Sequence, residues 1–234
     1  PNLSENCLGR AYVLAQLIER NHEVEIVGPQ FEHEIWEPIK HKYDYRGVKT
    51  GIRTYQFPFC VPDLLDKITG DVVYVSKPVT TSYGLGLLAT LSRDRPLILD
   101  IDDWETGFSH TEGRLDTYVK GIPRLIYMNS YYYKRVFAYL AKLADARTVS
   151  NRFLQDRFGG TLIPHAKDTD KLDPSRFDQS RIREELGLPA DDFLVMFSGT
   201  PRSHKGVDDL ARAVATIDRE DVRAVVVGAH ESEY

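Results

Sequence analysis

Short apolar runs alternate with segments of helical periodicity along this chain, and this alternation constrains its fold more than any other feature. Residues 71–76, 96–103 and 193–198 are predicted strands. The last of them is an uninterrupted apolar run, typical of a strand buried on both faces. Strands that alternate with helices imply βαβ units and parallel sheets. The sequence therefore predicts an α/β fold, with ligands beyond the carboxyl ends of the strands.

The composition excludes several classes of protein. The 234 residues are 42% hydrophobic and 28% charged, which is ordinary for a globular chain. A net charge of −5 gives no overall field that favours nucleic acid, so we expect no nucleic-acid partner and only a local anion site. No apolar run approaches the roughly 20 residues of a membrane span, and no signal peptide is visible. Cys7 and Cys60 fit neither a metal-ligand nor a disulfide pattern. Two free thiols and a cytoplasmic location are expected.

Four local elements complete the prediction. A helix is expected within residues 3–21, with Arg10 off its apolar face. A strand is expected at 22–29, stopping at its Gly-Pro, and another at 52–57. Ser150 is expected to cap the helix that follows it.

The run at 193–198 is followed by a segment suited to an anion. Gly199 lets the backbone approach a ligand, and the next loop carries Arg202, His204 and Lys205. Helical spacing begins after Gly206, and a helix start offers unpaired N–H groups to a phosphate. An ordinary turn with solvated basic residues is the alternative, and this segment alone does not decide between the two.

This segment, together with the Val-Val-Val-Gly of residues 225–228, resembles the start of the C-terminal domain of retaining GT-B glycosyltransferases of family 4. In that family, basic residues here hold the diphosphate of a nucleotide-sugar donor. The resemblance therefore assigns diphosphate binding to Gly199, Arg202, Lys205 and Gly206. Two residues separate the arginine from the first glycine, whereas many members place it directly after the glycine, so Lys205 is the better match.

Two further segments follow the order of elements in the same family. Residues 21–29 resemble the end of the first helix and the second strand, with Asn21 in place of the usual glycine. Residues 144–164 resemble the Ala-Asp pair, strand, helix and Ile-Pro strand that lead into the interdomain linker. The resemblance implies a GT-B fold, with two Rossmann-like domains built on parallel sheets. Its predicted parts are an acceptor-side domain (1–164), a linker (165–179) and the start of a nucleotide-sugar-binding domain (180–234).

The resemblance also implies that parts of the family fold lie outside these residues. The family's first strand and the later half of its C-terminal domain have no counterpart, so the second domain is expected to be incomplete. The missing half carries a Glu-x7-Glu element that contacts the donor sugar and ribose. For these residues alone we expect weak donor binding and no turnover. Gly9 would be the remaining glycine of the acceptor-side loop, or else an ordinary residue in the first helical turn.

Acidic residues end the strand at 96–103, at the edge of the sheet where ligands are expected. Asp102 and Asp103 are the candidate catalytic or acceptor-orienting residues. Asp100 and Asp102 also spell Asp-x-Asp, the metal motif of the other glycosyltransferase fold, GT-A. Because the surrounding pattern resembles GT-B, which typically needs no metal, we expect no metal and no cofactor.

The leading functional hypothesis is a glycosyltransferase that retains anomeric configuration. Its substrates would be a nucleotide-diphosphate sugar, held between the two domains, and an acceptor that is a glycan, a lipid or a small molecule. One alternative is a non-catalytic binding module with the same fold. Another alternative is a dinucleotide-dependent oxidoreductase, whose fingerprint is Gly-x-Gly-x-x-Gly directly after a strand. This alternative is weaker, because Gly84-Leu85-Gly86 has neither the third glycine nor a strand close before it.

A long helix is predicted over residues 122–145, with five tyrosines and the cations Lys134, Arg135 and Lys142. Such a helix is compatible with peripheral contact to a membrane. Core packing, with tyrosine hydroxyls reaching the surface, is the favoured interpretation.

Overall fold

The computed structural model describes residues 2–31, 34–107, 123–128, 130–201 and 205–228. Contacts between Cα atoms divide the chain into two compact units, Pro1–Lys167 and Asp168–Tyr234. We call them unit 1 and unit 2 and describe each by itself. Among the described residues, no helix has the length and apolar character needed to cross a membrane.

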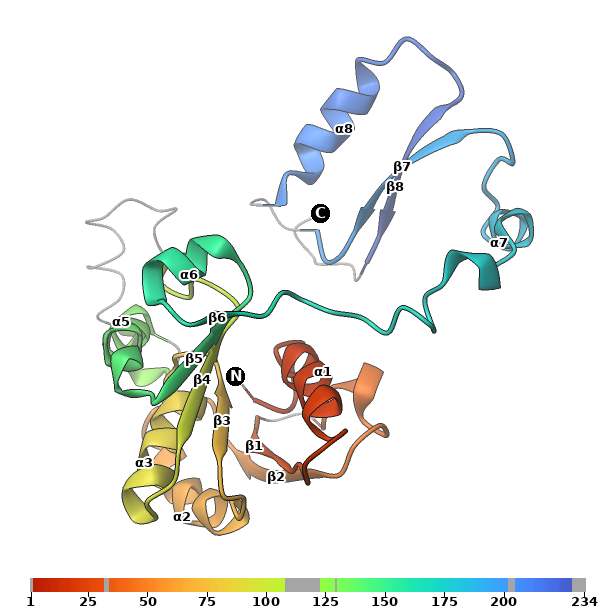
Figure 1. The fold of residues 1–234 in the computed structure, drawn as a ribbon. Helices are drawn as coiled ribbons and strands as arrows, with labels where there is room; N and C mark the ends of the chain where they lie inside the picture. The colour runs from red at the N-terminus through yellow and green to blue at the C-terminus, as the bar shows by residue number, and fades with distance from the viewer. Residues whose placement is uncertain (1, 32–33, 108–122, 129, 202–204, 229–234) are drawn as a thin grey trace. The chain divides into compact units, whose positions relative to one another are not determined.

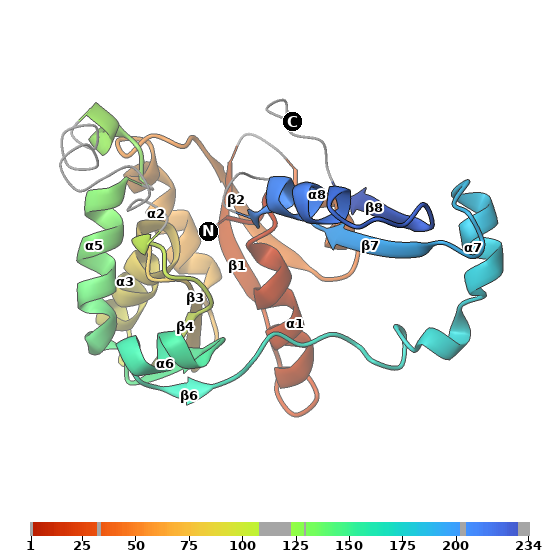
Figure 2. The same cartoon turned by 90° about the horizontal axis from the view of Figure 1, so that it is seen from above.

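Unit 1 is an α/β structure built on parallel strands (Figures 1 and 2). Its strands are β1 (Ile26–Phe31), β2 (Tyr45–Thr50), β3 (Val73–Ser76), β4 (Leu97–Ile101), β5 (Ala146–Val149) and β6 (Thr161–Leu162). Its helices are α1 (Leu8–Ile18), α2 (Phe57–Lys67), α3 (Leu85–Ser92), α5 (Tyr131–Leu140) and α6 (Arg152–Phe158). The strands form a parallel pair, β1–β2, and a parallel four-stranded sheet in the order β3-β4-β5-β6. The prediction of an α/β fold with parallel sheets is confirmed.

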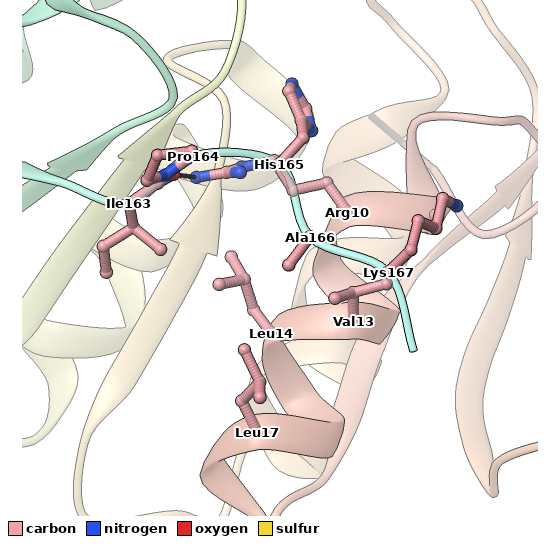
Figure 3. Close-up of a pocket in the computed structure, with 10 residues that line it drawn as sticks. Arg10, Val13, Leu14, Leu17, Ile163, Pro164, His165, Ala166 and Lys167 are labelled. Atoms are coloured by element: carbon pink, nitrogen blue, oxygen red, sulfur yellow. Dashed lines mark hydrogen bonds between the residues drawn. The ribbon is translucent and has the colours of Figure 1, made fainter. Parts of the chain in front are cut away.

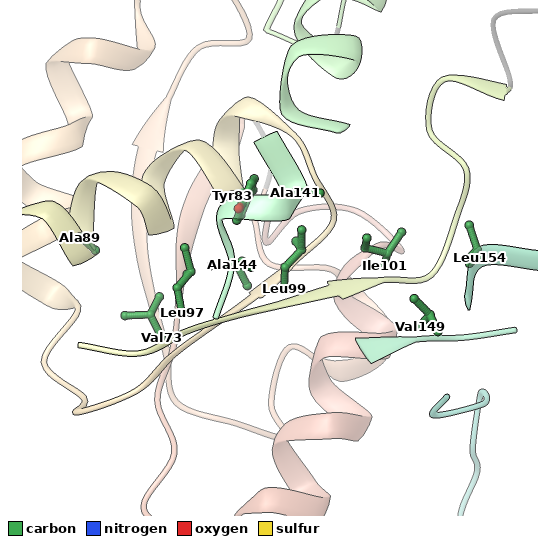
Figure 4. Close-up of a cluster of buried hydrophobic side chains, with 11 residues drawn as sticks. Val73, Tyr83, Ala89, Leu97, Leu99, Ile101, Ala141, Ala144, Val149 and Leu154 are labelled. Atoms are coloured by element: carbon green, nitrogen blue, oxygen red, sulfur yellow. The ribbon is translucent and has the colours of Figure 1, made fainter. Parts of the chain in front are cut away.

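The side chains of unit 1 alternate along the strands because successive residues point to opposite faces. In β1, Val27 and Phe31 pack in a cluster with α2 and α3, while Ile26 packs in another with Leu8 of α1. The largest cluster lies around the four-stranded sheet, where Leu99 and Ile101 are fully buried (Figure 4). Helices therefore cover both faces of β1, while the largest cluster lies on one face of the four-stranded sheet.

Unit 2 contains a smaller parallel pair. Its elements are α7 (Gln179–Glu185), β7 (Phe193–Ser198), α8 (Val207–Ala215) and β8 (Val222–Val227). The prediction that β7 is buried on both faces is wrong, since Phe193 and Met196 are 60% and 62% exposed. Among the described residues of unit 2, α8 is the helix that packs on β7 and β8, so one helix covers this pair.

Two predicted strands differ from the structure. The strand expected at 52–57 is wrong: β2 lies earlier, and Phe57 begins α2 with Pro58 in its first turn, where the missing N–H costs nothing. The strand expected at 22–29 begins later and continues through Pro29 to Phe31. Proline is tolerated because, among the described strands, β1 pairs only with β2, so Pro29 lies in an edge strand.

Two helix predictions also need correction. The long helix expected over 122–145 is shorter, because a 3₁₀ turn at Pro123–Ile126 precedes α5 and another follows it at Ala141–Leu143. Residues 122 and 129 lie outside the described part. The cap of α6 is Asn151 rather than Ser150, since the Asn151 side chain accepts a hydrogen bond from the backbone N–H of Leu154 at 2.9 Å.

Candidate functional site

The carboxyl ends of β3 and β4 bring charged residues together in unit 1. Lys77 follows β3 directly, and Asp102 and Asp103 follow β4. Because β3 and β4 are parallel neighbours, these residues lie at the same edge of the sheet. The two candidate aspartates therefore lie where the sequence placed them, and a lysine that the sequence analysis did not select lies beside them.

Lys77 is the centre of this group, which we call the Lys77 cluster (Lys77, Asp102, Asp103, Glu105 and Lys134). The ammonium of Lys77 lies 2.6 Å from a carboxylate oxygen of Asp103, 2.9 Å from Glu105 and 3.3 Å from Asp102. Lys134 of α5 contacts the second oxygen of Glu105 at 2.9 Å. Three carboxylates and two cations thus form one network at the end of β4.

The backbone of Lys77 is also unusual. Its φ of +70° makes it the one non-glycine residue with positive φ in the part of the chain that the structure describes. Its N–H donates to the carbonyl of Asp100 at 2.8 Å, and its own carbonyl accepts from Val79 and from the Ser82 hydroxyl. A left-handed conformation costs a residue with a side chain roughly 1 kcal/mol or more, and such strain gathers at functional sites. These backbone bonds hold the strained conformation that aims the ammonium at the carboxylates.

Burial and pairing set different proton affinities for the acids of the cluster. Burial raises the pKa of Asp102, and the negative charges of Asp103 and Asp100 raise it further, while Lys77 opposes the rise. Burial also acts to raise the pKa of Glu105, but Lys77 and Lys134 outweigh it and lower that pKa to about 2. At neutral pH, Glu105 is therefore a fixed anion, and Asp102 is the acid that takes up a proton more easily than usual.

The two aspartates differ in their access to solvent. The Asp102 side chain is 9% exposed, and its Oδ1 has no hydrogen-bond partner within the described residues, although it lies 3.3 Å from the Lys77 ammonium. The Asp103 side chain is 45% exposed. Asp103 can therefore accept a hydrogen bond from a ligand hydroxyl, while Asp102 shapes the field behind it.

Asp100 has a different role from the one its Asp-x-Asp spacing suggests. Its Oδ2 accepts from Arg10 Nε at 2.8 Å, and its Oδ1 accepts from Arg10 Nη2 at 2.9 Å and from the Thr148 hydroxyl at 2.7 Å. Both oxygens of this fully buried carboxylate are occupied by protein donors. No group of three or more metal-ligand side chains is found among the described residues. Asp100 is the buried counter-ion of Arg10.

Arg10 is buried, although the sequence places it off the apolar face of its helix. It is buried at 8% exposure and also donates to the Ile163 carbonyl at 2.8 Å, so it joins α1 to β4 and to the segment after β6. It lines a pocket of about 200 Å³ with Leu14, Leu17 and residues 163–167 (Figure 3). Gly9, also at this pocket, lies in the first turn of α1 rather than in a loop. A Cβ there would lie 3.3 Å from the Trp36 ring.

The predicted anion segment lies in unit 2, between β7 and α8. Gly199 has φ of +134° and Gly206 has φ of +69°, so both adopt conformations that favour glycine. Gly206 immediately precedes α8, and the Lys205 ammonium lies 3.6 Å from where a Cβ of Gly199 would stand. Gly199, Lys205 and Gly206 are thus brought together. Arg202 lies outside the described residues.

A close backbone approach fixes the shape of this segment. A Cβ on Gly228, just after β8, would lie 2.0 Å from the carbonyl oxygen of Gly199. The start of the loop therefore depends on a glycine directly after the neighbouring strand. The first turn of α8 carries two acids, Asp208 and Asp209. Among the described residues of the loop between β7 and α8, Lys205 is the one that carries a positive charge.

The glycines behind the oxidoreductase alternative serve a packing role. Gly84 ends a π-helical turn, and Gly86 lies inside α3. A Cβ on Gly86 would lie 2.6 Å from the Val75 side chain, and one on Gly84 would lie 2.9 Å from the Phe137 ring. These glycines let α3 approach the sheet and α5 approach the π-helical turn, and they do not form a phosphate-binding turn.

Comparison with known proteins gives no independent assignment: no protein-family model matches this chain, and no curated protein matches it.

Proposed function

We propose that this chain belongs to a nucleotide-sugar-dependent glycosyltransferase of the retaining GT-B type. The observation that carries the proposal is the arrangement β7, Gly199, Lys205, Gly206, α8 in unit 2. Two glycines with positive φ, a cation and a helix start converge there, and this combination suits the diphosphate of a nucleotide sugar.

The segment between β7 and α8 would contribute to the reaction electrostatically. When the bond between the sugar and the diphosphate breaks, negative charge develops on the leaving diphosphate. Lys205 and the N–H groups at the start of α8 would stabilise that charge, which is the largest contribution expected where little acid–base chemistry is needed. The Lys77 cluster in unit 1 would serve the acceptor, with the half-exposed carboxylate of Asp103 accepting a hydrogen bond from the acceptor hydroxyl.

Nucleotide binding tests the proposal. UDP, GDP, ADP and NAD would be compared by thermal shift and by isothermal titration calorimetry. We expect one nucleoside diphosphate to bind and Lys205→Ala to weaken that binding about tenfold or more, because a charge-assisted contact is worth roughly 1.5–3 kcal/mol. Lys42→Ala is the matched control, since Lys42 is an exposed lysine of unit 1, and it should leave the affinity within about twofold.

Three outcomes would contradict the proposal: equal effects of the two lysine substitutions, tight binding of NAD alone, or no binding of any diphosphate. Nucleotide binding without sugar transfer in a screen of acceptors would instead favour the non-catalytic binding module.

A further inference from the structure

The pocket beside α1 has no part in the proposed sugar transfer, and all ten residues that line it belong to unit 1. It lies between one face of α1 and the segment that follows β6 (Figure 3). Its apolar walls are formed by six side chains: Val13, Leu14, Leu17, Ile163, Pro164 and Ala166. A concave site with such walls suits the hydrocarbon part of a small ligand.

The polar side chains of this pocket are all basic. They are Arg10, His165 and Lys167, and none of the ten lining residues is acidic. Asp100 balances the charge of Arg10 from outside the pocket lining, so Lys167 adds a further positive charge. The polar part of a ligand in this pocket is therefore expected to be negative.

The guanidinium of Arg10 offers a hydrogen-bond donor in this pocket. Its side chain is only 5% exposed, and three hydrogen bonds from Nε and Nη2, to Asp100 and to the Ile163 carbonyl, fix its position. No acceptor for its Nη1 is found among the described residues. Buried polar groups ordinarily have a partner, so Nη1 is available to a ligand oxygen without any rearrangement of the protein.

We propose that this pocket binds a small aliphatic monocarboxylate. Its hydrocarbon chain packs on Val13, Leu14 and Leu17, and its carboxylate accepts a charge-assisted hydrogen bond from Arg10 Nη1. A cavity of about 150 Å³ accommodates benzene, so this one, of about 200 Å³, has room for roughly eight non-hydrogen atoms, the size of hexanoate. The inference rests on the pocket alone and does not need the proposed nucleotide binding.

Titration of the ¹⁵N-labelled protein with sodium hexanoate, at constant pH and ionic strength, tests this proposal. We expect saturable shifts of the backbone amide signals of residues 9–17 and 163–167. The expected Kd is on the order of 1 mM, which is within reach of a ligand of this size. Acetate lacks most of the hydrocarbon chain, and hexylammonium carries the opposite charge. Each should bind at least about tenfold more weakly than hexanoate.

Leu17→Glu tests the place of the site, because it puts a carboxylate at the pocket in an exposed position. It should weaken hexanoate binding about tenfold or more through like-charge repulsion and the loss of an apolar contact. Leu88→Glu is its matched control, since Leu88 also lies in a helix, α3, and is 44% exposed against 41% for Leu17. The control should leave the affinity within about twofold.

Two substitutions test the cations. Arg10→Met with Asp100→Leu removes the guanidinium donor without leaving a buried charge unpaired, and it should weaken hexanoate binding roughly tenfold. Lys167→Gln, at an exposed side chain that can be changed without harm to the fold, should weaken it about threefold, whereas the exposed Lys42→Gln should not. Circular dichroism of every variant would show that it remains folded.

Four results would overturn the inference. The first is an absence of saturable shifts at residues 9–17 and 163–167. The second is equal binding of hexanoate and hexylammonium. The third is an equal effect of Leu17→Glu and Leu88→Glu. The fourth is concentration-dependent self-association that Leu17→Glu abolishes and hexanoate does not, because the pocket would then be a contact between copies of this chain.

Discussion

Replacing Lys77 by methionine removes the cation that three carboxylates face, while keeping a side chain of similar length. Asp102 and Glu105, whose side chains are 9% and 11% exposed, would lose their shared ammonium. Glu105 keeps Lys134, but among the described residues Asp102 has no second cation within 4 Å. Removing one partner from a buried ion pair typically costs about 3–5 kcal/mol. We expect a loss of this size in the free energy of unfolding at pH 7.

The pH dependence of stability shows how the difference between the variant and the wild type should change in acid. The pKa of Glu105 lies at about 2, against an ordinary value of 4.5, and this difference corresponds to about 3 kcal/mol of stabilisation. That stabilisation is present above pH 4.5 and is lost as the pH falls toward 2. In the variant, Glu105 and Asp102 take up protons at higher pH and then need no cation. The difference in the free energy of unfolding between Lys77→Met and the wild type should therefore shrink to roughly 1–2 kcal/mol at pH 3.

Urea unfolding followed by tryptophan fluorescence measures this directly, because both tryptophans, Trp36 and Trp104, lie in unit 1. Lys42→Met is the surface control and should change stability by less than about 0.5 kcal/mol. Lys77→Gly should lose roughly 1 kcal/mol less than Lys77→Met, because glycine relieves the strain at φ of +70°. The reasoning would be refuted if Lys77→Met were less than about 1 kcal/mol less stable than the wild type at pH 7, or if this difference in stability were the same at pH 3 as at pH 7.

Two further predictions concern the interior of unit 1. Arg10→Met leaves the carboxylate of Asp100 buried without its cation, so urea unfolding should show a loss of about 3–5 kcal/mol, which the double variant with Asp100→Leu largely restores; a double variant no more stable than the single one would contradict this. Cys60 is buried, and burial raises the pKa of its thiol, whereas Cys7 is partly exposed. A thiol reagent should therefore label Cys7 in the native protein and Cys60 only on unfolding, and rapid labelling of native Cys7→Ser would contradict this.

Local sequence patterns located the strands that a few consecutive apolar residues are enough to identify. The apolar runs at β3 and β4 were found because a buried parallel strand has few polar positions, and the same pattern located β7 without predicting its exposure. The prediction for residues 52–57 failed because Pro58, directly after them, favours the first turn of a helix, so Phe57 begins α2. Whether a helix face is exposed, or the second face of a strand is buried, depends on which other segments pack against it. A local sequence pattern carries no information about those segments.

The candidate site was predicted only in part, for the same reason. The acids after β4 and the glycines around Lys205 were found because strand ends and glycines carry local signals. Arg10 was missed because its partner, Asp100, lies 90 residues away. Lys77 was also missed, although a cation directly after one strand and acids directly after the next were signals that could have located it.

The most direct test of the central claim locates nucleotide binding on the chain. Titration of the ¹⁵N-labelled protein with UDP, GDP and ADP would be followed by the backbone amide signals. The proposal predicts that one nucleotide shifts the amides of Gly199, Lys205, Gly206 and the first turn of α8. An absence of shifts with all three nucleotides, or shifts confined to residues 84–86 of unit 1, would contradict it.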